Sequence, residues 1–247
     1  MLIKFAVSDF DFEKIFRSGL FYFFYTEKPE RRILLGNKSV NLEFYQKRSF
    51  LYVSSIAAIP DAERREIKKR INYCLGIEED LSKFYSVCKN DWILKNFLPR
   101  IKKTRIISSY TDFEALAGAV VSQNNSYANY RKQMRRIYEK TDFRPEKCAA
   151  NADRFKVGYK AAYLKELSVN YGKMPIKNIK GIGAYSLNLF EIFQRRNYGA
   201  FYVDCLTEKI MKQSYGVKKD FEREAFNLWG EYRGLSLAFL QRFFEIK

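Results

Sequence analysis

A glycine turn followed by a helix and an aspartate, between Ile179 and Asp204, constrains this chain more than any other stretch. The turn is Gly181-Ile182-Gly183, and we expect each of its glycines to need a positive φ or a very close neighbour. The run from Leu189 to Phe193 has apolar residues at the i, i+3, i+4 spacing of a buried helix face. Such a turn directs backbone N–H groups at a helix start, where a phosphate binds without any side chain. A phosphate clamp and the Asp204 carboxylate are therefore a fixed distance apart along the chain.

The charge of the chain points to a polyanionic partner. Its 247 residues include 45 Lys and Arg against 28 Asp and Glu, a formal net charge of +17. Nucleic acid is the commonest partner of such a protein, and a basic protein that binds none is the alternative. No apolar run approaches the roughly 20 residues of a membrane-spanning helix, and acids interrupt the first residues, unlike a signal peptide. We expect no membrane partner and an intracellular, soluble protein of the cytoplasm or nucleoid.

The cysteines and the missing histidines restrict the chemistry. No pair among Cys74, Cys88, Cys148 and Cys205 has the CxxC spacing of a zinc or iron–sulfur site. The chain has no histidine, which excludes Ser-His-Asp triads and histidine metal sites. We therefore expect no zinc and no iron–sulfur cluster, and acid–base chemistry must come from Asp, Glu, Lys, Tyr or Cys.

The first part of the chain has the pattern of an antiparallel sheet. Short runs rich in β-branched and aromatic residues alternate with Gly, Asn, Lys and Pro, which is typical of strands joined by turns. These runs are Leu2–Val7, Leu20–Tyr25, Arg32–Leu35, Val40–Tyr45 and Phe50–Ser54. Helical patterns cover 10–17, 61–74, 78–87 and 91–97. We predict an N-terminal α+β domain from residue 1 to 98.

From Pro99 onwards the pattern is helical. Amphipathic or buried helices are predicted over 112–121, 127–139, 160–169, 184–194, 206–213, 218–229 and 234–244. Short polar or glycine-containing segments join them, and no repeat or long linker interrupts them. The fold class is therefore α+β, with a helical bundle at 99–247 that holds a site in a groove against the N-terminal domain.

Four further segments support one interpretation of the glycine turn. They are Phe12–Gly19 (FEKIFRSG), Leu75–Tyr85 (LGIEEDLSKFY), Val121–Ser126 (VSQNNS) and Val157–Leu164 (VGYKAAYL). In this order, with the glycine turn and its aspartate, they resemble the helix-hairpin-helix DNA glycosylases of the 8-oxoguanine and 3-methyladenine branches. The resemblance implies a helix-hairpin-helix in the helical domain. It also implies a monomer that binds double-stranded DNA containing a damaged base, turns that base out of the duplex and cleaves its N-glycosidic bond.

The resemblance makes Asp204 the catalytic residue. Cleavage passes through a transition state with positive charge on the sugar, which a fixed carboxylate stabilises while it orients or deprotonates the attacking water. The alternative is a helix N-cap for a helix near Leu206, since aspartate is a favoured cap. Both roles can hold at once, because capping would fix the carboxylate in place.

Tyr185 is a departure from the lyase members of that family. Those enzymes have a lysine two residues after the second hairpin glycine, and its amine forms a Schiff base that leads to strand cleavage. A tyrosine here is similar to the aromatic residue of the hydrolytic 3-methyladenine branch, and its ring suits stacking on an electron-poor base. The alternative is a tyrosine at the rim without base contact. Lys180 and Lys209 remain as candidate relocated nucleophiles, although such lysines more often contact phosphate.

Three more residues belong to the expected base pocket. Gly19 matches a family glycine whose carbonyl contacts 8-oxoguanine, and a plain turn is the alternative. Leu189 and Gly234 stand where the resemblance leads us to expect a cysteine and a glutamine of the 8-oxoguanine pocket. These two departures favour a different lesion and leave the reaction unchanged.

The expected DNA contacts lie in two loops. Asn124 matches the asparagine that fills the hole left by a flipped base, with Gln123 and Asn125 beside it; a turn-forming Asn pair, or a wedge by Tyr127, is the alternative. The amides of Gly181 and Gly183 are expected to bind phosphate, aided by basic residues at Lys177, Lys180, Arg195 and Arg196.

The hairpin of this chain is short. Tyr171–Lys180 leaves room for only about one turn of its first helix. The resemblance also implies a possible monovalent cation held by hairpin carbonyls.

Together these observations predict a hydrolase of a damaged purine, an alkylated purine first and 8-oxoguanine second, without strand cleavage. Two alternatives stay open: an 8-oxoguanine glycosylase and lyase with a relocated lysine, and a DNA-binding helix-hairpin-helix module without catalysis. An RNA-binding helical protein is a third.

Overall fold

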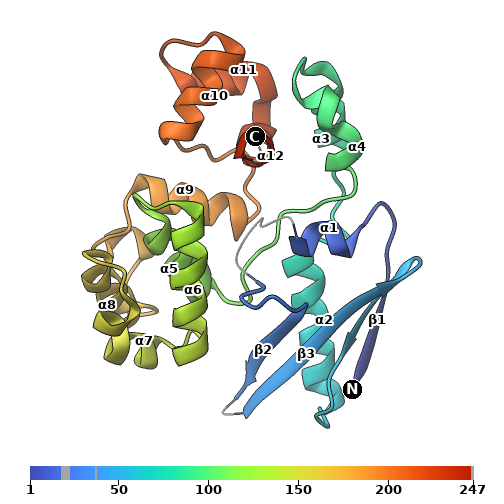
Figure 1. Ribbon diagram of the computed structural model, residues 1–247, viewed down its shortest axis with the longest axis vertical. Coiled ribbons are helices and arrows are strands. Elements are labelled where there is room, and N and C mark those ends of the chain that lie inside the picture. The colour runs from blue at the N-terminus through green and yellow to red at the C-terminus, as the bar shows by residue number, and fades with distance from the viewer. Residues whose placement is uncertain (18–22, 37, 246–247) are drawn as a thin grey trace.

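The computed structural model describes residues 1–17, 23–36 and 38–245. It has the α+β architecture predicted from the sequence, with an antiparallel sheet at one end and helices over the rest (Figure 1). Within the described ranges the sheet has the order β1-β4-β3-β2. Its strands are β1 (Leu2–Ala6), β2 (Glu30–Leu35), β3 (Lys38–Lys47) and β4 (Phe50–Ser54).

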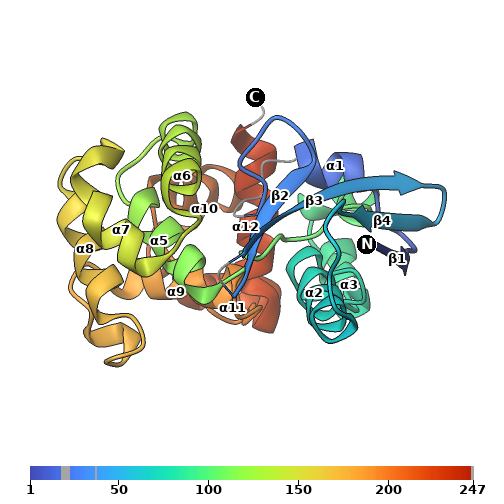
Figure 2. The same cartoon turned by 90° about the horizontal axis from the view of Figure 1, so that it is seen from below.

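One face of the sheet is buried. Alternate residues of each strand point inward, as in β1, where Ile3 and Phe5 are buried and their neighbours are exposed. The alternation of apolar and polar residues in the sequence therefore places the apolar side chains on one face of the sheet. Helix α2 (Asp61–Leu75) covers that face, and α1 (Phe12–Arg17) packs with it at the edge of the same buried cluster (Figure 2).

The strand predicted over Leu20–Tyr25 is wrong in its described part. Residues 18–22 lie outside the described residues, and Phe23 to Tyr25 form no strand. Phe23 and Phe24 both pack on Phe44 of β3, with ring centroids 5.7 and 5.2 Å away. Tyr25 packs against Tyr138 at 5.0 Å. Three consecutive side chains that all find apolar partners cannot alternate between the faces of a strand.

The helices predicted after Pro99 are all present, with ends shifted by a few residues. They are α5 (Asp112–Ser122), α6 (Tyr127–Thr141), α8 (Lys160–Asn170), α9 (Ala184–Phe193), α10 (Cys205–Tyr215), α11 (Phe221–Trp229) and α12 (Arg233–Glu245). Before them come α3 (Ser82–Asn90), η1 (Leu94–Phe97) and α4 (Leu98–Ile101). The short α7 (Pro145–Asn151), η2 (Ala152–Phe155), η3 (Ile176–Asn178) and η4 (Gly230–Tyr232) complete the set. The sequence did not predict α7, because seven residues carry little periodicity.

Helices far apart in sequence lie side by side. α3 and the segment after it pack on α12 (Figure 1), with Phe84 stacked on Phe239 at 5.6 Å and Phe97 on Phe243 at 4.3 Å. The buried cluster of the sheet contains residues up to Ile77 and, further along the chain, Ile107, and the larger helical cluster begins at Leu81. A division into domains at residue 98 stays a prediction.

A buried ion pair joins the sheet to the helices. Arg31 of β2 donates to Glu114 of α5 at 2.6 Å, and their side chains are 4% and 1% exposed. The Arg31 guanidinium also donates to the Phe23 carbonyl, and the Tyr25 hydroxyl donates to the second carboxylate oxygen of Glu114. Burial raises the pKa of Glu114, while the guanidinium acts in the opposite direction. The pair therefore fixes the sheet against α5 only as long as both charges are present.

We expect Glu114→Leu to lower the free energy of unfolding by about 3 to 5 kcal/mol, because Arg31 is left buried without a counter-charge. The double variant Arg31→Met/Glu114→Leu should recover most of that loss. Urea denaturation of the two variants measures both effects. The control is Glu139→Ala, which removes a half-exposed pair with Arg135 and should cost less than about 1 kcal/mol. A double variant as unstable as Glu114→Leu would contradict the explanation.

Candidate active site

The two glycines of the turn differ in backbone conformation and in their surroundings. Gly181 has φ +94°, and a Cβ there would lie 2.4 Å from the ring of Tyr163. Only glycine satisfies both conditions. Gly183 has φ −96°, and no heavy atom lies within 4 Å of where its Cβ would be. The prediction that Gly183 needs a positive φ or a close neighbour is wrong, since its surroundings are open.

Gly183 is the N-cap residue of α9, and no side chain caps this helix. The first N–H groups of an α-helix have no partner within the helix. The open space at Gly183 therefore lets a ligand approach these donors from outside, as a phosphate does at a helix N-terminus.

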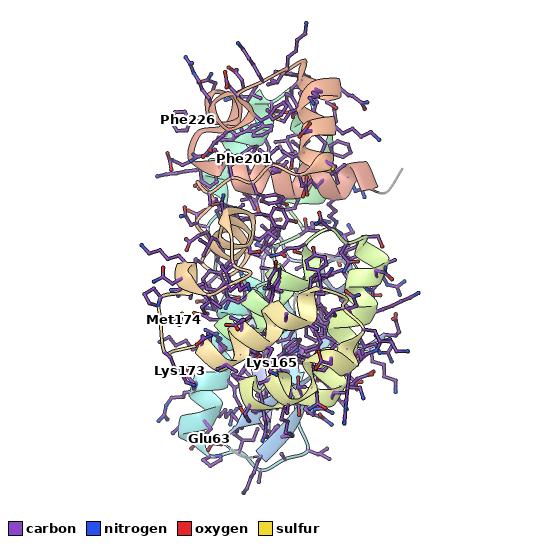
Figure 3. The ribbon with its side chains drawn as sticks, turned by 90° about the vertical axis from the view of Figure 1, so that its left-hand side faces the viewer. Glu63, Lys165, Lys173, Met174, Phe201 and Phe226 are labelled. Carbon is purple, nitrogen blue, oxygen red and sulfur yellow. The ribbon has the colours of Figure 1, made fainter. Side chains whose placement is uncertain are left out.

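The hairpin is as short as predicted. Its first helix is the single 3₁₀ turn η3, and the buried side chains of Ile179 and Ile182 anchor the turn that follows. Lys177 and Lys180 are exposed on it. The loop before η3 carries Lys173 and Met174 at the outer edge of the molecule (Figure 3). Exposed lysines thus precede the open N-terminus of α9 in the chain.

The two arginines expected to aid phosphate binding have other partners. Arg196 pairs with Glu79 at 2.7 Å and donates to the carbonyls of Tyr73 and Ile106, so it fastens the end of α9 to the turn after α2. The prediction of a phosphate contact for Arg196 is wrong, because its side chain is 11% exposed. Arg195 pairs with Asp112 at 3.1 Å.

A cavity of about 670 Å³ lies beside the hairpin. Its walls come from the loop between α5 and α6, from α6 itself, from α9, from the segment leading into α10 and from α12. The lining residues are Ser122, Gln123, Asn124, Asn125, Tyr127, Tyr130, Tyr185, Leu189, Phe193, Tyr202, Val203, Asp204, Cys205, Leu206 and Gln241. The cavity therefore brings together five of the residues predicted from the sequence (Gln123, Asn124, Asn125, Tyr185 and Leu189) with Asp204.

Asp204 is the N-cap of α10. Its Oδ1 accepts hydrogen bonds from the backbone N–H of Thr207 at 2.7 Å and from the Thr207 hydroxyl at 2.8 Å. The carboxylate is half-buried and lines the cavity. The capping role is thus present, and it holds the side chain in one orientation, as expected.

Gln241 of α12 is a site residue that the sequence did not indicate. Its Nε2 donates to Asp204 Oδ1 at 3.1 Å, to Oδ2 at 3.3 Å and to the Thr207 hydroxyl at 3.1 Å. Its Oε1 accepts from the Tyr202 hydroxyl at 2.5 Å. No motif spacing connects Gln241 with Asp204, since 37 residues separate them.

Tyr185 faces the same cavity from the first turn of α9. Its ring meets that of Tyr202 edge to face, with centroids 5.4 Å apart and an interplanar angle of 86°. Burial raises the pKa of Tyr185, and the negative charge of Asp204 raises it further. The phenol is therefore neutral at ordinary pH. One turn further along, Leu189 is buried in the cavity wall.

In the loop between α5 and α6, the side chains of Gln123 and Asn125 form hydrogen bonds within the protein, and that of Asn124 is exposed. Gln123 donates to the Gly181 carbonyl at 2.8 Å and so ties this loop to the hairpin. Asn125 donates to the Val121 carbonyl. Asn124 is exposed, has φ +45° and donates to the Tyr159 hydroxyl at 3.2 Å. Asn124 and Tyr159 therefore form an exposed pair beside the cavity.

Lys160 of α8 forms hydrogen bonds with this loop and with the end of α5. Its side-chain amine donates to the carbonyls of Val121 and Gln123, each at 2.9 Å, and the residue is 4% exposed. Burial lowers the pKa of Lys160. The amine satisfies carbonyls at the end of α5 that have no partner within the helix. Sequence reasoning missed this role, because a lysine in a helical pattern is usually exposed.

The remaining predicted residues lie elsewhere or are not described. Gly19 lies outside the described residues. Gly234 is not in the cavity lining; a Cβ there would lie 2.4 Å from the Ala200 carbonyl, so it lets α12 cross the chain closely. Lys180 and Lys209 are exposed and do not line the cavity either.

Two further observations concern metals and membranes. Among the described residues, no group of three or more His, Cys, Asp or Glu side chains is placed to hold a metal ion. The Gly181 carbonyl, a hairpin oxygen, accepts from Gln123; a monovalent cation at the hairpin stays a prediction. Within the part of the chain that the structure describes, no helix is both long and apolar enough to cross a membrane.

Comparison with known proteins finds similar structures and no similar sequence family. No protein-family model matches the sequence, and no curated protein matches it. MBOgg1 in complex with a low-affinity DNA ligand matches with a TM-score of 0.76 at 16% identity, covering 98% of this chain and 94% of that one. The Clostridium acetobutylicum 8-oxoguanine glycosylase/lyase, in complex with double-stranded DNA containing cytosine opposite 8-oxoguanine, matches with a TM-score of 0.75 at 18% identity, covering 100% and 98%. The 3-methyladenine DNA-glycosylase from Archaeoglobus fulgidus matches with 0.75 at 16% identity, covering 99% of each chain.

These matches confirm the fold that the resemblance implied. The chain has the fold of the helix-hairpin-helix DNA glycosylases over its whole described length.

We expect Gly181→Ala to lower the free energy of unfolding by about 2 kcal/mol or more, because a Cβ would strain the left-handed backbone and overlap Tyr163. The matched control is Gly183→Ala, two residues away in open space, which should change stability by less than about 1 kcal/mol. Urea denaturation compares the two variants. Equal losses would show that the close approach of Tyr163 does not explain the glycine.

Proposed function

We propose that this protein is a DNA glycosylase of base-excision repair, which hydrolyses the N-glycosidic bond of a damaged purine turned out of duplex DNA. The observation that carries the proposal is the position of Asp204. Its carboxylate lines a cavity of about 670 Å³, and α9, whose N-terminus is open to a phosphate, contributes Tyr185 to the same wall. A phosphate clamp, an aromatic face and a fixed carboxylate are the parts that this reaction needs.

In the proposed reaction Asp204 acts on the sugar of the flipped nucleotide. The bond between C1′ and the base nitrogen breaks, and its electron pair leaves with the base. The carboxylate stabilises the positive charge that develops on the sugar. Water then forms the new bond to C1′, and Asp204 orients it and accepts its proton. The hydrogen bonds from Thr207 to Oδ1 leave Oδ2 as the oxygen with fewer donors, suited to face the sugar and the water.

We propose hydrolysis without a Schiff base. None of the described residues that line the cavity is a lysine, and Tyr185 stands where lyase members of the family have one. Lys180 and Lys209 are exposed outside the lining. Lys160 is buried with its amine on two carbonyls, so it is not presented to a substrate.

The cavity favours an alkylated purine over 8-oxoguanine. A third of its described lining residues are aromatic, namely Tyr127, Tyr130, Tyr185, Phe193 and Tyr202. The face of an aromatic ring attracts a cationic or electron-poor base. 8-Oxoguanine is the second candidate, because the structural matches include an enzyme named for that lesion.

DNA binding is proposed at the hairpin and at the Asn124–Tyr159 pair. The open amides of α9 would hold a phosphate near the flipped nucleotide, with Lys177 and Lys180 as nearby cations. Asn124 and Tyr159 project beside the cavity, where an amide and a ring can fill the space that a flipped base leaves. The formal net charge of +17 adds attraction that is independent of sequence. We propose that the protein acts as a monomer on DNA within the cell.

The proposal is tested with end-labelled duplexes that each contain one lesion, including an alkylated adenine, hypoxanthine, uracil and 8-oxoguanine. Half of every reaction is treated with hot alkali. We expect strand breaks only after alkali, and first in the duplex with the alkylated adenine, because water rather than an amine attacks C1′. Breaks without alkali would support the lyase alternative. Duplexes that bind and are never processed would support a binding module without catalysis.

We expect Asp204→Asn to lower the single-turnover rate of base release by at least about a hundredfold, because the amide cannot stabilise the sugar cation as a carboxylate does. Affinity for the lesion duplex should change little. The control is Glu208→Gln on the same helix, an exposed residue paired with Lys212, which should keep the wild-type rate. Normal turnover by Asp204→Asn would remove this carboxylate from the mechanism.

A further inference from the structure

The described residues that line the cavity around the Asp204 carboxylate include neither lysine nor arginine. The titratable groups that face it there are Tyr185 from α9, Tyr127 and Tyr130 from α6, Tyr202 from the preceding segment and Cys205 from α10. Each of these groups is neutral or becomes negative, so none compensates the charge of Asp204. The side-chain oxygens of Asp204 accept hydrogen bonds from neutral donors, namely the Thr207 N–H and hydroxyl and the Gln241 amide.

Gln241 is the donor that comes from outside α10. The two Thr207 groups belong to the same helical turn as Asp204 and both bind Oδ1. Gln241 adds a contact to Oδ1 and is the described residue that donates to Oδ2, at 3.3 Å. It thereby contacts the oxygen that the capping interaction leaves out.

Tyr202 determines which end of the Gln241 amide faces Asp204. The Tyr202 hydroxyl donates to Gln241 Oε1, so the amide oxygen is turned away from the carboxylate and Nε2 is turned toward it. Nε2 has two hydrogens, and its acceptors are Asp204 and the Thr207 hydroxyl. With all its polar atoms engaged inside the protein, Gln241 is not free to recognise a base.

We propose that Gln241 is a positioning residue for the reaction, which keeps the Asp204 carboxylate aimed at the sugar. The proposal rests on the function proposed above. Two hydrogen bonds from one amide fix the plane of the carboxylate, and a neutral amide supplies them without cancelling the negative charge that the sugar cation needs. The C-terminal helix α12 thus takes part in the chemistry through Asp204.

The test uses Gln241→Met, which has a similar length and no hydrogen-bonding groups. We expect single-turnover base release to fall by about tenfold to a hundredfold at neutral pH, as for loss of a hydrogen bond to a charged group. Affinity for the lesion duplex should stay within about threefold, because Gln241 does not contact the base. A loss of rate without a matching loss of affinity is the expected signature of a carboxylate that is present but no longer held in place.

Gln241→Glu provides a second variant of nearly the same shape. Its added carboxylate cannot donate a hydrogen bond to Asp204 and repels it. Single-turnover base release should therefore fall further than in Gln241→Met. The matched control is Gln213→Met, an exposed glutamine on α10, which should keep the wild-type rate and affinity.

The outcomes separate the two proposals. A wild-type protein that releases no base from any lesion duplex overturns the proposed function, and the role of Gln241 with it. An active wild type with an equally active Gln241→Met overturns the Gln241 proposal alone. A rate that falls together with the affinity for the lesion duplex and with the melting temperature also overturns it, because that pattern indicates a structural role. If Gln241→Met does not fold, the rate and the affinity of Gln241→Glu decide in the same way.

Discussion

The hydrogen bonds that hold a half-buried carboxylate are the interaction on which the candidate site depends. Asp204 lies at the wall of a cavity whose described lining contains no lysine or arginine. Removing a carboxylate from water is costly unless hydrogen bonds replace the water. The chain supplies those bonds by starting α10 at Asp204 and by bringing α12 across it. The close crossing at Gly234, where a Cβ would meet the Ala200 carbonyl, brings α12 close to the segment before Asp204.

A connected set of hydrogen bonds and close contacts joins the hairpin to the cavity. Gln123 connects the loop after α5 to the Gly181 carbonyl, and Lys160 holds the carbonyl of Gln123 itself. The ring of Tyr163, on α8 with Lys160, occupies the place where Gly181 would have a Cβ. A phosphate held at the start of α9 and a base in the cavity would thus be positioned by one connected set of groups. These contacts use buried polar atoms that are paired, as the cost of an unpaired buried group requires.

The structure shares a fold with glycosylases that differ widely from it in sequence. At 16 to 18% identity the matches extend over nearly the whole of both chains. A fold of this kind is preserved by the spacing of apolar residues and by a few close approaches, which many sequences satisfy. The fold constrains the residues that line a cavity less, so positions such as Tyr185 and Leu189 can vary without changing the architecture.

The sequence by itself determined the features that arise from neighbouring residues. Periodicity identified the helices after Pro99 and four of the five expected strands, and the glycine turn and the cap at Asp204 could be predicted because their partners lie within a few positions. Tertiary structure alone decided which residues meet across long separations. Gln241 reaches Asp204 across 37 residues, Lys160 reaches Val121 across 39, and Arg196 reaches Glu79 across 117. It also left Phe23 to Tyr25 outside any strand, because Phe23 and Phe24 pack on Phe44 of β3 while Tyr25 packs on Tyr138 of α6. No local spacing encodes such contacts, since they depend on where whole helices cross, and the crossing is fixed only when the two buried clusters form.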